Sequence, residues 1–257
     1  PSHQYLFNGL KVEHESEVMA HQGKYPVIFL TFKDVKEMTW DHAFERIQSE
    51  ISDLYRVHQN ILQNSSVSEH EREVYQQLLN EQGTQIQSTK SLKFLMELLF
   101  RVHQQKVVVL IDEYDSPIHA SYQYGYYDQM IGFMRGFLSG GFKDSNCLEK
   151  GVITGILRVA KESIFSGFNN ALVYTLLDNN FSQYFGFTQE ELDQMLQDFN
   201  LEDRRDEIQT WYNGYWFGNQ RVIYNPWSVV HYISHPDAEA KAYWINTSDN
   251  ALIRDLI

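Results

Sequence analysis

The sequence predicts an α/β fold in which helices flank a parallel sheet, followed by a smaller helical domain. Apolar runs rich in β-branched residues mark the candidate strands, at residues 25–32, 107–111 and 151–156, with a weaker run at 171–177. Helical segments separate these runs, and such alternation is typical of parallel sheets. From residue 188 onward the pattern is helical and poor in strands. We therefore expect an α/β core over residues 1–186 and a helical subdomain over 187–257.

Helices are predicted between the strands, where apolar residues recur at helical spacing. They are expected at residues 38–62, 69–80, 88–103 and 126–138. We expect Gly140 and Gly141 to end the last of these, since glycine commonly follows a helix. Thr188 and Glu191 have the spacing of a capping box, which predicts that a helix of the second domain begins there.

The composition limits the classes of function. The chain has 257 residues and a net charge of −13, and so acidic a chain is not expected to bind nucleic acid or anionic membranes directly. A single cysteine, Cys147, indicates a reducing compartment. Because there is neither a signal-peptide pattern nor an apolar stretch long enough for a membrane span, we expect a cytoplasmic protein. The chain begins at Pro1 and stops inside a helix-like pattern at Ile257, so we expect a fragment of a longer protein.

The strongest functional signal is the apolar run at 107–111, which leads directly into Asp112 and Glu113. We expect this strand, like that at 25–32, to be buried on both faces, with the carboxylates at its C-terminal end, where α/β sheets bind ligands. This is the form of a Walker B segment. Asp112 would hold Mg²⁺, and Glu113 would orient the water that attacks a γ-phosphate. The alternative is a buried strand followed by a solvated acidic turn.

The phosphate-binding half of such a site is absent from this sequence. A P-loop requires Gly-x-x-x-x-Gly-Lys-Ser/Thr, whose backbone N–H groups surround the phosphates. The only Gly-Lys pair is Gly23-Lys24, and Tyr25 follows it while Val18 stands at the first glycine position. The chain therefore carries the part of the site that handles metal and water, and the residues that would bind the nucleotide stay unknown.

Two further residues are candidates for the same site. Thr154 lies at the end of the strand expected beside the Walker B strand, where its hydroxyl could contact the attacking water or the γ-phosphate; it could equally bond to nearby backbone. Arg158 could stabilise transferring phosphoryl charge as an arginine finger does. Its alternative is a surface ion pair with Glu162, four residues later.

An aromatic cluster interrupted by glycines occupies residues 211–218 and 224–227. Aromatic side chains in a basic groove can stack nucleotide bases, but the surroundings here are not basic. We interpret the cluster as a packed turn between helices of the second domain.

Several of these motifs, in the same order, resemble the bacterial AAA-ATPase-like family of predicted ATPases. The matching segments are YLFNGL (5–10), GKYPVIFLTFKDVK (23–36), VVVLIDEYDSPI (107–118), GILRVAKESIFSGF (155–168), WYNGYWFG (211–218) and YNPWSV (224–229). The resemblance implies a P-loop NTPase fold of the AAA/RecA type that lacks its first strand and Walker A motif. It also implies Walker B roles for Asp112 and Glu113, sensor positions at Thr154 and Arg158, and a PD-(D/E)XK nuclease-like domain C-terminal to this chain.

The same resemblance implies an order for the strands. The run at 151–156 would lie beside 107–112, with 27–32 on the far side, and the strand that carries the P-loop would separate 151–156 from 171–177. We expect the chain to be the core and lid of an ATPase that uses ATP and Mg²⁺ to drive a conformational change. As an isolated fragment it would be inactive, and homo-oligomerisation stays open.

Two alternatives compete with this interpretation. The first is a regulatory or binding module, in which the fold persists without hydrolysis. The second is a metal-dependent phosphoesterase or nuclease built on Asp112, Glu113 and Asp115. Two-metal sites need several carboxylates within a few ångströms, and the sequence contains only this one cluster.

Overall fold

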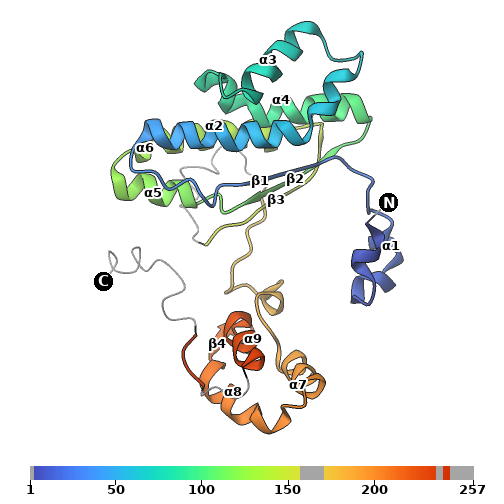
Figure 1. Ribbon diagram of the computed structural model, residues 1–257, viewed down its shortest axis with the longest axis vertical. Coiled ribbons are helices and arrows are strands. Elements are labelled where there is room, and N and C mark those ends of the chain that lie inside the picture. The colour runs from blue at the N-terminus through green and yellow to red at the C-terminus, as the bar shows by residue number, and fades with distance from the viewer. Residues whose placement is uncertain (1–2, 157–170, 236–239, 244–257) are drawn as a thin grey trace. The chain divides into compact units, whose positions relative to one another are not determined.

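The computed structural model describes residues 3–156, 171–235 and 240–243. The chain divides into two compact units, residues 1–171 and 172–257. Each unit has its own hydrophobic core of buried side chains. Figure 1 draws the elements of both units.

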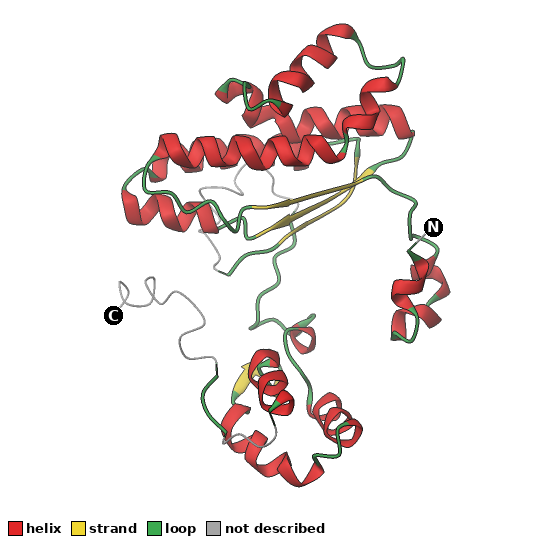
Figure 2. Ribbon diagram, in the orientation of Figure 1, coloured by secondary structure: helices red, strands yellow, loops and turns green. Residues whose placement is uncertain are grey.

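The first unit contains a parallel sheet of three strands in the order β1-β2-β3, as predicted (Figure 2). The strands are β1 (Val27–Thr31), β2 (Val107–Asp112) and β3 (Leu148–Ile153). Leu110 of β2 lies opposite both Phe29 and Val152. β3 begins and ends three residues earlier than expected, so Thr154 directly follows the strand.

The prediction of a fourth strand at residues 171–177 is wrong. The segment has no regular secondary structure, and the side chains of Leu172 and Leu177 are 80% and 83% exposed. Asp178 accepts bonds from the Thr175 N–H (2.6 Å) and hydroxyl (2.8 Å), which closes a turn. The Leu176 carbonyl accepts a bond from the Gly218 N–H at 2.8 Å, so this segment belongs to the second unit.

The structure has a helix in each of the four predicted intervals of the first unit, and one more at residues 116–124 that the sequence analysis did not predict. They are α2 (Trp40–Val57), α3 (Glu69–Leu79), α4 (Gln85–His103), α5 (Ser116–Tyr124) and α6 (Tyr127–Phe142). Before β1 the chain forms the short turns η1 (Gln4–Phe7), η2 (Lys11–His14) and α1 (Ser16–Met19), and η3 (Gln59–Gln63) follows α2. Helix α4 begins three residues before the expected start, because Thr84 and Gln87 form a capping box that the apolar periodicity does not reveal.

Helices α2, α4 and α6 lie on the same side of the sheet and pack against β1, β2 and β3 respectively (Figure 1). They bury Ile28, Leu30 and the alternate residues of β2 that begin with Val107. Because the strand order always advances in one direction, right-handed crossovers carry each helical connection over the same face.

The expectation of burial on both faces is therefore wrong. On the face opposite the helices, Val27, Phe29 and Val152 are 45%, 58% and 44% exposed, while Val108 and Leu110 are half-buried. The apolar runs are continuous, but the described helices cover only every second residue of them.

Helix α6 does not end at the glycine pair as predicted, but continues to Phe142. An added Cβ at Gly141 would lie 2.6 Å from Leu92 Cδ2, and one at Gly136 would lie 2.5 Å from Thr89 Cγ2. The lack of a side chain at Gly136 and Gly141 allows α6 to pack closely on α4, and the helix continues through both residues.

The second unit is mainly helical, and the helix predicted from the Thr188 capping box is confirmed. Its elements are η5 (Ser182–Tyr184), α7 (Gln189–Asp198), η6 (Glu202–Arg204), α8 (Arg205–Tyr212), the antiparallel hairpin β4 (Tyr215–Phe217) and β5 (Gln220–Ile223), and α9 (Pro226–Ser234). The division between the units precedes the expected boundary near residue 186, because residues before α7 bond to the hairpin region: Phe187 pairs with Tyr224, and Gly218 with Leu176.

Candidate functional site

Asp112 is the last residue of β2, at the carboxyl end of the sheet. It lies opposite Thr31, and its carbonyl accepts a bond from the Phe32 N–H at 3.0 Å, so the neighbouring strand fixes its backbone. By alternation along β2, its half-buried side chain belongs to the face that the helices leave uncovered. A carboxylate held in this way would supply an oxygen ligand of the kind that Mg²⁺ prefers.

Glu113 adopts a left-handed backbone conformation, with φ +50°. This conformation costs a residue with a Cβ about 1–2 kcal/mol, so surrounding contacts must maintain it. It turns the chain sharply out of β2. The Ser116 hydroxyl donates to Glu113 Oε2 at 2.9 Å, and the Ser116 N–H donates to the Glu113 carbonyl at 3.2 Å. The turn and the serine together fix the orientation of the Glu113 carboxylate.

Thr154 approaches Asp112 from the neighbouring strand. Its hydroxyl donates to Asp112 Oδ1 at 2.7 Å, and its N–H donates to the Ile111 carbonyl at 2.8 Å. The Thr154 side chain is exposed. The structure therefore brings together three of the four predicted site residues, Asp112, Glu113 and Thr154, at one end of two adjacent strands.

The fourth candidate, Arg158, lies outside the described residues, as does its alternative partner Glu162. Neither the arginine-finger interpretation nor the ion-pair interpretation is tested by the geometry, and both stay predictions.

Sequence reasoning missed the part that Asp115 takes in this site. Its side chain is 1% exposed, and Oδ2 accepts a bond from the Ile156 N–H at 2.9 Å and lies 3.3 Å from His119 Nε2. An added Cβ at Gly155 would lie 2.5 Å from Asp115 Oδ1. The i, i+4 spacing of Asp115 and His119, and the glycine after Thr154, are the signals in the sequence that indicate this contact.

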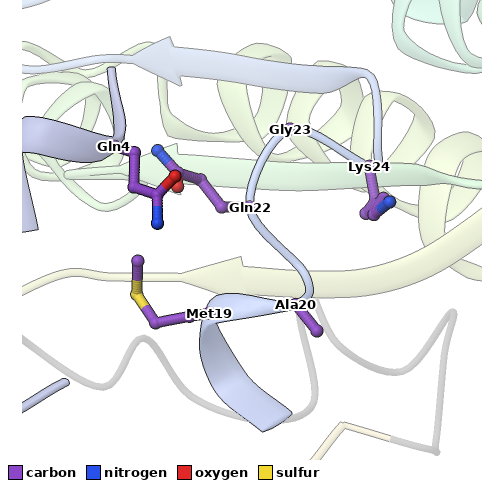
Figure 3. A pocket seen from close by; sticks show the side chains of 6 residues that line it. All are labelled: Gln4, Met19, Ala20, Gln22, Gly23 and Lys24. Carbon is purple, nitrogen blue, oxygen red and sulfur yellow. The ribbon is translucent and has the colours of Figure 1, made fainter. Parts of the chain in front are cut away.

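The Gly23–Lys24 pair lies at the amino ends of the parallel strands, whereas Asp112 lies at their carboxyl ends. It precedes the start of β1, whereas Asp112 lies opposite the last residue of that parallel strand. A hollow of about 550 Å³ includes both residues (Figure 3). Its lining side chains come from the short turns before β1 and from the loop that enters it: Gln4, Met19, Ala20, Gln22, Gly23 and Lys24. Lys24 is thus not positioned to contact phosphates bound beside Asp112.

The aromatic cluster of the second unit is partly core and partly surface. The Tyr212 ring packs on Tyr232 with 5.8 Å between centroids, and its hydroxyl donates to the Lys241 carbonyl at 3.0 Å. Trp211 and Trp216 are 51% and 64% exposed. The motif forms the end of α8 and the hairpin β4–β5, which agrees with a packed turn but adds strands that the sequence analysis did not predict.

Among the residues that the structure describes, no group of three or more His, Cys, Asp or Glu could hold a metal ion. None of their helices combines the length and the apolar character needed to cross a bilayer.

Comparison with known proteins identifies the family. The chain is 31% identical over 166 residues to the "Uncharacterized protein in vnfD 5'region" of Azotobacter chroococcum mcd 1, an alignment that covers 63% of this chain and 31% of that protein. The chain thus spans about a third of the length of this relative. No solved structure matches the chain. The model of the AAA-ATPase-like family, described as "Predicted AAA-ATPase", matches residues 1–165, which include β1, β2, β3 and the residues around Asp112. The chain belongs to this family of predicted AAA-ATPases.

Proposed function

We propose that this chain supplies the metal-binding and water-activating carboxylates of an ATPase that hydrolyses ATP with Mg²⁺. The observation that carries the proposal is the contact between two strand ends. Asp112 and Glu113 follow one apolar strand, and Thr154 from the next strand donates to Asp112 Oδ1 at 2.7 Å. Family membership supports the same reaction class.

Each residue has a distinct task in this proposal. Asp112 would hold Mg²⁺ directly or through water, and bound Mg²⁺ would supply charge neutralisation at the phosphates. Glu113 orients and polarises the attacking water, and the Ser116 hydroxyl holds its carboxylate at 2.9 Å. Thr154 keeps Asp112 in place and presents its exposed hydroxyl to the site. Arg158, two residues beyond Ile156, is proposed as the cation that stabilises phosphoryl charge.

The remaining parts of the ATPase are proposals of a broader kind. The nucleotide's phosphates would be held by a P-loop outside this sequence, and the second unit would serve as the lid. A PD-(D/E)XK nuclease-like domain in the same protein, a cytoplasmic location and homo-oligomerisation belong to the same proposal. Hydrolysis would then drive a conformational change between the core and its attached domains.

A regulatory or binding module on the same fold is the second candidate, because it needs the sheet but not the reactivity of Glu113. The phosphoesterase alternative is less favoured. It requires Asp115 as a metal ligand, but this side chain is 1% exposed and accepts a backbone bond from Ile156.

Substitution of Glu113 separates the two leading candidates. In the full-length protein, Glu113→Gln should abolish ATP hydrolysis while ATP still binds, because an amide does not polarise the water as a carboxylate does. Single-turnover hydrolysis and calorimetric binding of Mg·ATP measure the two properties. Glu149→Gln changes an exposed glutamate in the neighbouring strand β3 and serves as the control. Turnover by Glu113→Gln close to that of Glu149→Gln would refute the role of Glu113.

A further inference from the structure

We propose that Asp115 is a positioning residue whose buried carboxylate joins the backbone after β3 to the turn after β2, and thereby keeps Thr154 on Asp112. The structural part of this inference stands on the geometry of the turns. Its consequence for turnover rests on the proposed function.

Asp115 continues the hydrogen bonding between β2 and β3 beyond the point where β2 ends. Thr154 N–H donates to the Ile111 carbonyl at 2.8 Å, and Tyr114 N–H donates to the Thr154 carbonyl at 3.1 Å. Between these two bonds lies Glu113, whose backbone is left-handed and whose carbonyl accepts a bond from the Ser116 N–H at 3.2 Å. The next amide of the β3 side, Ile156 N–H, donates instead to Asp115 Oδ2 at 2.9 Å.

The carboxylate makes this contact in place of the local one that its position on α5 predicts. Asp115 occupies the N-cap position of α5, where aspartate commonly accepts a bond from an amide of the first helical turn. Its side chain makes no such cap bond. It points across to the backbone that follows β3, and bonds from an amide to a charged acceptor are about twice as strong as neutral ones.

Two neighbours hold the carboxylate in this position. His119, one turn further along α5, lies with Nε2 3.3 Å from Asp115 Oδ2. On the other side, Gly155 passes so close that an added Cβ would lie 2.5 Å from Asp115 Oδ1 and 2.7 Å from Tyr114 Cε1. Only a residue without a Cβ fits between the two turns, so the close approach of these segments requires glycine at position 155.

The consequence concerns Thr154, which lies between the two anchored points. With Ile156 fixed on one side and the ladder of β3 on the other, the Thr154 hydroxyl is held at 2.7 Å from Asp112 Oδ1. Loss of the Asp115 contact would free the backbone after Gly155 and loosen the threonine. We expect this to lower kcat more than it raises KM, because Asp115 contacts neither nucleotide nor metal in the proposed site.

Hydrogen exchange tests the structural part without relying on activity. In the full-length protein, Asp115→Ala should speed exchange in a peptide covering residues 154–156 by roughly 10- to 100-fold, the range for loss of one hydrogen bond to a charged group. Exchange in α4 should change much less. Asp115→Asn, whose amide oxygen can still accept from Ile156, should retain most of the protection. Asp128→Asn, at an exposed carboxylate of α6, is the control.

Steady-state kinetics on the same proteins tests the consequence for turnover. Asp115→Ala and Gly155→Ala should each lower kcat about tenfold or more with KM changed less than about threefold, and Asp115→Asn should lie near the wild type. Should Asp115→Ala fail to fold, Gly155→Ala breaks the same contact from the opposite side. Exchange at residues 154–156 that stays at the level of Asp128→Asn overturns the inference. An inactive wild-type protein refutes the proposed function alone, and the exchange data still decide the role of Asp115.

Discussion

The packing of α6 on α4 makes a sharp prediction about two adjacent glycines. Gly141→Ala adds a methyl group 2.6 Å from Leu92 Cδ2, 2.9 Å from Leu92 Cγ and 3.3 Å from Met96 Sδ. Leu92 and Met96 are 0% and 1% exposed, so neither side chain has room to move away. Overpacking of this kind costs about 1–3 kcal/mol, whereas alanine gains about 1 kcal/mol in helix propensity. We expect a net loss of up to about 2 kcal/mol in the free energy of unfolding.

Gly140→Ala is the matched control, one residue earlier in the same helix. Its added Cβ would meet Lys93 Cβ at 3.7 Å, an ordinary contact. The helix-propensity gain should therefore dominate and stabilise the protein by up to about 1 kcal/mol. Urea unfolding followed by circular dichroism, with equal slopes for the two variants, measures the difference. If Gly141→Ala were as stable as Gly140→Ala, the close packing of α6 on α4 through Gly141 would be refuted.

Two further predictions concern the helix ends. The bidentate hydrogen bond from Arg101 lowers the pKa of Glu71 to about 2 from its usual 4.5. Folding therefore favours the ionised carboxylate. The stability that this ion pair gives the folded state is fully present above pH 4.5 and is lost as the pH falls toward 2. Glu71→Gln should lower the free energy of unfolding by about 1 kcal/mol at pH 7, after allowance for solvent screening. It should also make stability less dependent on pH between 4.5 and 2. Glu69→Gln, at a side chain that is 84% exposed, should do neither. Thr188→Ala removes the capping box of α7 and should cost about 1 kcal/mol in unfolding of the second unit, whereas Thr188→Ser should retain it; equal melting temperatures for the two variants would contradict this.

Sequence patterns were sufficient where a local signal coincides with the structure. The apolar runs place β1 and β2, the capping box at Thr188 begins α7, and the Asp-Glu pair follows β2. In each case a few neighbouring residues carry the information, because apolar periodicity and capping act over one or two turns.

Local signals misled where distant residues decide the outcome. The glycine pair in α6 has the composition of a helix end, but its neighbours in space are Leu92 and Lys93 of α4, about fifty positions earlier in the chain. The run at 171–177 has the composition of a strand, but a strand needs a partner, and its backbone contact is with Gly218 of the second unit.

The sequence by itself determined the chemistry of the candidate site: which carboxylates follow the strand, and in which order. Tertiary structure alone decided how they are held. The turn at Glu113 depends on a left-handed backbone angle. The bonds from Thr154 to Asp112 and from Ile156 to Asp115 join segments about forty residues apart in the chain. It also decided that the helices cover one face of the sheet, since successive crossovers in a single direction carry them to the same side.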